Sequence, residues 1–145
     1  MPSTDYVAEA TIEIRSTPED VWDALTEPER IQKYMFGTRV ETDWNVGSPI
    51  AWKGEWEGKQ YEDKGKILVF DPERELSYSH YSPLTGAPDV PENYHTVTIK
   101  LTPDDGVTNV TLTQDNNDTE EARDHSQRNW STMLQALKEH VEAGY

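Results

Sequence analysis

Cysteine is absent from this 145-residue sequence. Its absence excludes disulfides, thiol nucleophiles and thiolate metal sites, and it fits a reducing cytoplasm. No run of about 18 apolar residues occurs, so the sequence predicts no membrane-spanning helix. The first six residues, MPSTDY, form neither a basic nor an apolar stretch, so no secretory signal is visible. We therefore expect a cytoplasmic protein, with no metal or other cofactor.

Basic residues are scarce. The sequence has 13 Lys and Arg against 28 Asp and Glu, which gives a net charge of −15. Such a surface repels nucleic-acid phosphates and anionic membranes, and no basic patch interrupts it. The acidic residues are scattered singly, as on an ordinary solvated surface. Neither nucleic acid nor a membrane is expected as a partner.

Internal repeats and low-complexity linkers are also missing. A chain of this length suffices for one domain with its own hydrophobic core. We therefore treat residues 1–145 as a single domain and read its elements in order.

The N-terminal part predicts a strand followed by two short helices. Residues Val7–Arg15 alternate between apolar and polar side chains, which predicts a strand with one buried face. Thr17 as N-cap and Pro18 in the first helical position predict the first helix. Thr26 with Glu29 forms the pattern of a capping box, which predicts the start of the second.

The middle of the chain predicts antiparallel strands joined by turns. The turn Pro103–Gly106 predicts three cross-strand pairs: Ile99 with Val110, Val97 with Leu112, and His95 with Gln114. The loop Ser82–Glu92 predicts three more: Leu76 with Ile99, Tyr78 with Val97, and His80 with His95. Together these pairs form rows that change from aliphatic to polar along one face of the sheet. Such a change is expected near the mouth of a lined pocket.

The C-terminal part, about Thr119–Ala143, predicts one long helix. Its second half carries an apolar stripe at helical spacing: Trp130, Met133, Leu134, Leu137 and Val141. The same stripe continues toward the N-terminus of the helix through polar or smaller residues: Asn129, Ser126, Arg123 and Ala122. The helix is therefore apolar in one half and polar in the other.

Several segments in this order resemble a known family. They are TIEIRSTPEDVWDALTEPERIQKYM, GKILVFDPERELSY, VTNVTLTQ and NWSTMLQALKEHVE. The sequence is similar to the Hsp90-ATPase-activator-homologue-like (AHSA1-like) family of the START-like, or Bet v 1-like (SRPBCC), helix-grip superfamily. The resemblance covers about residues 6–143.

The resemblance implies an α+β fold. A curved antiparallel β-sheet of about 6–7 strands would grip the long C-terminal helix, with two short helices near the N-terminus. Related proteins often hold a hydrophobic ligand between sheet and helix. The family has no universal catalytic motif, so no catalytic residue is assigned. The Hsp90 role belongs to eukaryotic proteins with an additional N-terminal domain, so the resemblance favours Hsp90 less as a partner here.

Our first hypothesis is that the protein binds a small hydrophobic or aromatic molecule in that cavity, as a monomer or weak dimer. The predicted ligand-binding residues are Trp52, Tyr78, His80, His95, Val97, Leu112, Ser126, Trp130 and Met133. One alternative is an enzyme of the cyclase, aromatase or hydrolase type, with His80 or His95 as the acid–base group. Another is an Hsp90-associated or stress-response interaction protein.

Four features leave a structural and a functional interpretation open. Five inward aromatic rings could fill the core or line a pocket: Trp44, Trp52, Trp56, Tyr78 and Trp130. The histidine pair could be rim residues, ligand contacts or part of a metal site. The loop Ser82–Glu92 could be a lid or an ordinary connection. One group of carboxylates is expected in solvent on a hairpin: Glu55, Glu57, Glu62 and Asp63.

Overall fold

The computed structural model describes residues 6–35, 37–56, 58–82, 88–117 and 119–143. The strands are β1 (Tyr6–Ile14), β2 (Arg39–Thr42), β3 (Pro49–Trp56), β4 (Lys59–Asp71), β5 (Glu75–His80), β6 (His95–Asp104) and β7 (Val107–Asn117). The helices are α1 (Pro18–Thr26), α2 (Pro28–Tyr34) and α3 (Glu120–Glu142), and η2 (Pro91–Asn93) is a single 3₁₀ turn. The predicted α+β order of elements is confirmed.

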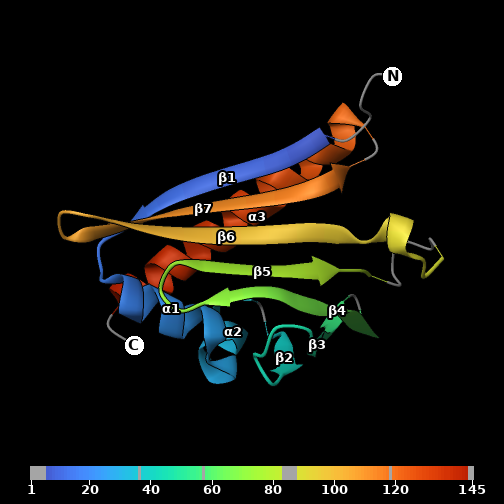
Figure 1. The fold of residues 1–145 in the computed structure, drawn as a ribbon, viewed down its shortest axis with the longest axis horizontal. Helices are drawn as coiled ribbons and strands as arrows, with labels where there is room; N and C mark the ends of the chain where they lie inside the picture. The colour runs from blue at the N-terminus through green and yellow to red at the C-terminus, as the bar shows by residue number, and fades with distance from the viewer. Residues whose placement is uncertain (1–5, 36, 57, 83–87, 118, 144–145) are drawn as a thin grey trace.

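All seven strands form one antiparallel sheet in the order β1-β7-β6-β5-β4-β3-β2. Helix α3 crosses behind the sheet and packs mainly on β1 (Figure 1). Helices α1 and α2 lie at the end of the molecule where α3 ends. This is the helix-grip arrangement that the resemblance implied.

The N-terminal elements form for the predicted reasons, with one exception. In β1 the inward residues Ala8, Ala10 and Ile14 are buried, and the polar residues between them are exposed. The Thr17 side chain caps α1 by accepting a hydrogen bond from the Asp20 N–H. The capping box at Thr26 was wrong, because the Thr26 hydroxyl donates to the Trp22 carbonyl inside α1. Helix α2 instead follows Glu27, which makes no side-chain cap.

The register of the central strands was half right. The β5–β6 pairs Leu76–Ile99, Tyr78–Val97 and His80–His95 are confirmed. The β6–β7 pairs were wrong by two residues: Ile99 pairs with Leu112, Val97 with Gln114, and Leu101 with Val110.

The turn explains this shift. Asp105 and Gly106 both have positive φ and form a two-residue loop between Asp104 and Val107. Asp-Gly is favoured in such a loop because its backbone twist matches that of the strands. A two-residue shift keeps each side chain on its predicted face, so the inward set is unchanged.

The hydrophobic core lies between the sheet and the C-terminal half of α3. Its fully buried members come from four strands and two helices: Ala8, Ile14, Val21, Ala24, Ile67, Val97, Val110, Leu112, Leu134 and Leu137. At this end α1 and α2 close over the sheet, and the aromatic pairs Trp22–Phe70 and Trp44–Phe70 pack edge to face or tilted. The core therefore occupies one end of the groove between the helix and the sheet.

Candidate functional site

The other end of that groove contains a cavity of about 250 Å³ against the N-terminal half of α3. We call it the α3 cavity. Its lining residues come from the end of α2, the start of β2, β7 and α3: Met35, Thr38, Gln114, Ser126, Asn129, Trp130 and Met133. Most of its lining surface is apolar, and small or polar side chains on α3 leave the space that large aliphatic residues fill further along the helix.

A second, more polar cavity of about 400 Å³ lies beside the first. We call it the histidine cavity. It is lined by residues of β5, the η2 region, β6, β7 and α3: His80, Ser82, Glu92, Asn93, His95, Gln114, Asn116, Ser126, Asn129 and Trp130. Four residues line both cavities: Gln114, Ser126, Asn129 and Trp130. The two cavities are therefore adjacent, with these four side chains between them.

Hydrogen bonds fix the shared residues. The Trp130 indole N–H donates to the Gln114 side-chain oxygen, and Gln114 is only 7% exposed. The Ser126 hydroxyl donates to Asn117 Oδ1 over 3.2 Å. The Asn117 amide nitrogen in turn donates to the carbonyls of Tyr6 and Gln114, 2.8 and 3.1 Å away. The cavity wall is thus tied to the end of β7 before any ligand is present.

A third space, the aromatic recess, has a volume of about 70 Å³ and is lined mainly by residues of β3, β4 and β5. Its lining residues are Met35, Thr38, Trp52, Tyr61, Asp63, Tyr78, His80 and Trp130. The Trp52 ring centroid lies 4.9 Å from that of Tyr78 and 5.0 Å from that of His80. Burial raises the pKa of Tyr78, so its hydroxyl stays protonated at neutral pH.

The recess contains an Asp–His pair. His80 Nε2 and Asp63 Oδ2 lie 2.9 Å apart, and the ring N–H donates to the carboxylate oxygen. Asp63 Oδ1 is buried and accepts no hydrogen bond from any residue that the structure describes. The side chains of Asp63 and His80 are 16% and 24% exposed. The recess therefore presents a carboxyl group with one unused acceptor oxygen.

Comparison with known proteins places this fold and groove in a family. A family model described as "Activator of Hsp90 ATPase homolog 1-like protein" (AHSA1) matches residues 15–142. The chain belongs to this family. A search of curated proteins gives no match.

Solved structures agree with this assignment. ChR145 from Cytophaga hutchinsonii is 55% identical to this AHSA1-like chain and has a TM-score of 0.84, over 95% of this chain and 94% of that one. The Aha1 dimer from Colwellia psychrerythraea is 23% identical with a TM-score of 0.75, over 96% and 98% of the two chains. Ara h 8.0201 is 15% identical with a TM-score of 0.75, over 97% and 99%. The last two show the fold alone.

Seven of the nine predicted site residues of this AHSA1-like chain line these spaces. Trp52, Tyr78 and His80 line the recess, and His95 lines the histidine cavity. The residues from α3 line the α3 cavity: Ser126, Trp130 and Met133. Val97 and Leu112 line none of the three, because both are fully buried in the core.

The two histidines pair in register but their rings bond elsewhere. His80 bonds Asp63, whereas His95 Nδ1 donates to the Asp115 carbonyl over 2.9 Å. In the part of the chain that the structure describes, no group of three His, Asp or Glu side chains is arranged to hold a metal ion. Each histidine thus contributes separately to the cavity walls.

Sequence reasoning misplaced Asp63. It was expected in solvent with its hairpin neighbours, and Glu55 and Glu62 are indeed exposed. Asp63 instead pairs with Trp52 across β3 and β4 and lies on the inner face. In a strand every second side chain points to the same face, so Asp63 shares the inner face of buried Ile67. The alternation of β4 could therefore have predicted that Asp63 faces inward.

Two other predictions concern residues that the structure does not fully describe. Glu57 and residues 83–87 of the Ser82–Glu92 loop lie outside the described residues, as does the side chain of Trp56. Of the other predicted aromatics, Trp52 and Tyr78 are buried, whereas Trp44 and Trp130 are partly buried. Core filling and pocket lining therefore both occur within the set.

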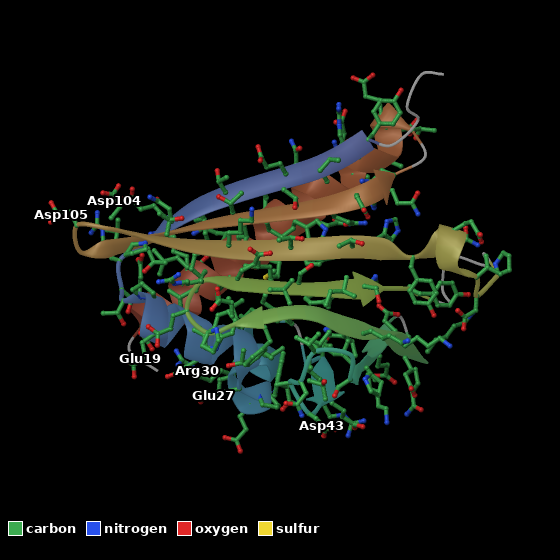
Figure 2. The ribbon with its side chains drawn as sticks, viewed as in Figure 1. Glu19, Glu27, Arg30, Asp43, Asp104 and Asp105 are labelled. Carbon is green, nitrogen blue, oxygen red and sulfur yellow. The ribbon has the colours of Figure 1, made fainter. Side chains whose placement is uncertain are left out.

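One group of surface carboxylates lies away from the cavities. Figure 2 labels Glu19 and Glu27 beside α1 and α2, and Asp104 and Asp105 at the β6–β7 turn. All four are exposed, and they lie at the end of the molecule opposite η2. Among the described helices, none is long and apolar enough to cross a membrane.

Proposed function

We propose that this AHSA1-like protein binds a small, largely apolar or aromatic molecule between the sheet and the N-terminal half of α3. The observation that carries the proposal is the pair of adjacent cavities, about 250 and 400 Å³, with a shared wall around Trp130. Ligand pockets commonly have volumes of about 300–1,000 Å³ and combine an apolar lining with a few polar groups.

The arrangement of side chains supports an oriented ligand. Met35 and Met133 offer adaptable apolar contacts in the α3 cavity, and Trp130 offers a large ring. His80 and His95 lie in the polar cavity beside it. A bound molecule would place its apolar body along α3 and its polar groups toward the histidines.

The test is a titration with the neutral fluorescent probe N-phenyl-1-naphthylamine. We expect saturable binding to the natural chain. Ser126→Phe places a ring in the wall shared by both cavities, so it should weaken probe binding at least about tenfold. The matched control is Ser131→Phe, which adds the same ring at an exposed position of α3.

Binding that is absent in the natural chain, or equal in Ser126→Phe and Ser131→Phe, would exclude this site. Circular dichroism of each variant checks that α3 and the sheet still form. Size-exclusion chromatography with light scattering tests the expected monomer or weak dimer. The cytoplasmic location and any Hsp90 association stay predictions.

A further inference from the structure

We propose that the aromatic recess binds the protonated amine of a ligand whose apolar body occupies the α3 cavity. This inference rests on the proposed function and names the chemical class of the ligand. It starts from Asp63, the carboxylate that faces inward on β4.

Asp63 presents an unused acceptor. Its Oδ2 is taken by the His80 ring, and its Oδ1 is buried without a hydrogen bond from the described residues. A buried charged acceptor that is left unpaired is costly, so a ligand that supplies a donor gains free energy there. An ammonium group supplies up to three donors together with the opposite charge.

The charges around the recess favour a cation. No Lys or Arg is among the described residues that line the recess, the α3 cavity or the histidine cavity. Lys64, next to Asp63 in sequence, bonds Asp89, and Lys53 on the neighbouring strand β3 bonds Glu41. With a net charge of −15, the protein also attracts cations at longer range. A carboxylate or phosphate ligand would instead be repelled.

The rings around Asp63 favour the same ligand. Trp52, Tyr61, Tyr78 and Trp130 line the recess, and faces of aromatic rings attract ammonium groups. At about 70 Å³, the recess has the volume of about two water molecules, which suits a headgroup and not a whole molecule.

The recess and the α3 cavity share three lining residues: Met35, Thr38 and Trp130. A primary amine in the recess can therefore continue as an apolar or aromatic body past Trp130. The ligand class is an amine with a small apolar body.

A purely structural role for Asp63 is the competing explanation. The Asp63–His80 bond joins β4 to β5 close to the irregular pairing at Ile67 and Val69. If joining the strands were its whole purpose, the charge of a ligand would not affect binding.

The experiment compares three probes that share a phenyl body: 2-phenylethylamine, 2-phenylethanol and 3-phenylpropanoate. Affinities come from ¹H–¹⁵N chemical-shift titrations of the natural chain at constant ionic strength. We expect the amine to bind at least about tenfold more tightly than the alcohol, because its bond to Asp63 is charge-assisted. The carboxylate should bind most weakly.

Asp63→Asn removes the charge and keeps the shape of the side chain. It should abolish the preference for the amine while leaving alcohol binding within about twofold. The matched control is Glu62→Gln, which makes the same change of net charge at the exposed neighbouring position and should preserve the preference.

Equal affinity for the amine and the alcohol in the natural chain would overturn the inference, and so would an amine preference that survives in Asp63→Asn. In either case, continued binding of N-phenyl-1-naphthylamine that is sensitive to Ser126→Phe would leave the proposed function standing. Loss of all binding in the natural chain would overturn both. If Asp63→Asn does not fold, the three-probe comparison still decides.

Discussion

The two halves of α3 pack against the same sheet, but only the C-terminal half fills the groove between them. In the C-terminal half, Leu134, Leu137 and Val141 are buried at 0–2% exposure, and α1 and α2 close the end (Figure 1). In the N-terminal half, Ser126, Asn129 and Trp130 border cavities. The backbone geometry is common to both halves, so the size and polarity of the side chains decide whether the groove is filled.

This difference separates stability from binding. Buried apolar area at the closed end supplies the driving force for folding. At the open end, beside the N-terminal half of α3, less apolar area is buried. Polar groups there remain accessible to a ligand. Substitutions at the two ends should therefore affect different measurements.

The largest expected effect on stability is at the closed end. Leu137→Ala removes a fully buried side chain and should lower the free energy of unfolding by about 2–5 kcal/mol. Asn129→Ala, on the exposed open half of the same helix, should change it by about 0.5 kcal/mol or less. Urea unfolding followed by circular dichroism measures both values. Similar losses for the two variants would contradict the division of α3 into two halves.

A smaller effect tests whether β4 and β5 are held close together at the open end of the groove. An added Cβ at Gly65 would lie 1.7 Å from the Ser79 carbonyl oxygen, so β4 and β5 would have to separate beside His80. Gly65→Ala should therefore cost about 1–3 kcal/mol. Gly54→Ala is the matched control on the inner face, since its Cβ would meet the end of the Tyr61 side chain, 2.6 Å away, which can move. Equal costs would show that the strands are not held closely at Gly65.

Elements with strong local signals could be predicted from the sequence. The alternation of β1, the Thr17 cap and the apolar stripe of α3 all depend on residues close together in the chain. The β6–β7 register failed because one residue of difference in the position of the turn shifts every pair by two. The Asp105-Gly106 dipeptide, whose two residues both have positive φ, marks that position.

The site was harder to predict because it depends on packing between distant segments. His80 and Trp130 were identified from their predicted faces, but nothing local shows that Val97 and Leu112 are covered completely. Asp63 was missed because carboxylates near a hairpin are usually solvated. Its burial depends on contacts with β3 and β5, which the sequence does not display.

The smallest expected effect concerns pH at the closed end. His140 is buried and accepts a hydrogen bond from Arg30 Nε over 3.1 Å, and Arg30 also bonds Asp20. Burial, followed by the charges of Arg30 and Lys33, lowers the pKa of His140 below its ordinary 6.5, and Asp20 opposes this. The unfolded chain therefore binds the proton first. The contribution of His140 is fully present above pH 6.5 and is lost as the pH falls toward the lower folded-state pKa.

His140→Gln keeps an acceptor for Arg30 but cannot take up a proton. Between about pH 7.5 and 5.5, the natural chain should lose more unfolding free energy than this variant does. Urea unfolding at both pH values gives the comparison, and the histidines at the open end cancel because they are common to both chains. Equal losses would mean that the Arg30–His140 contact places no penalty on protonation of His140.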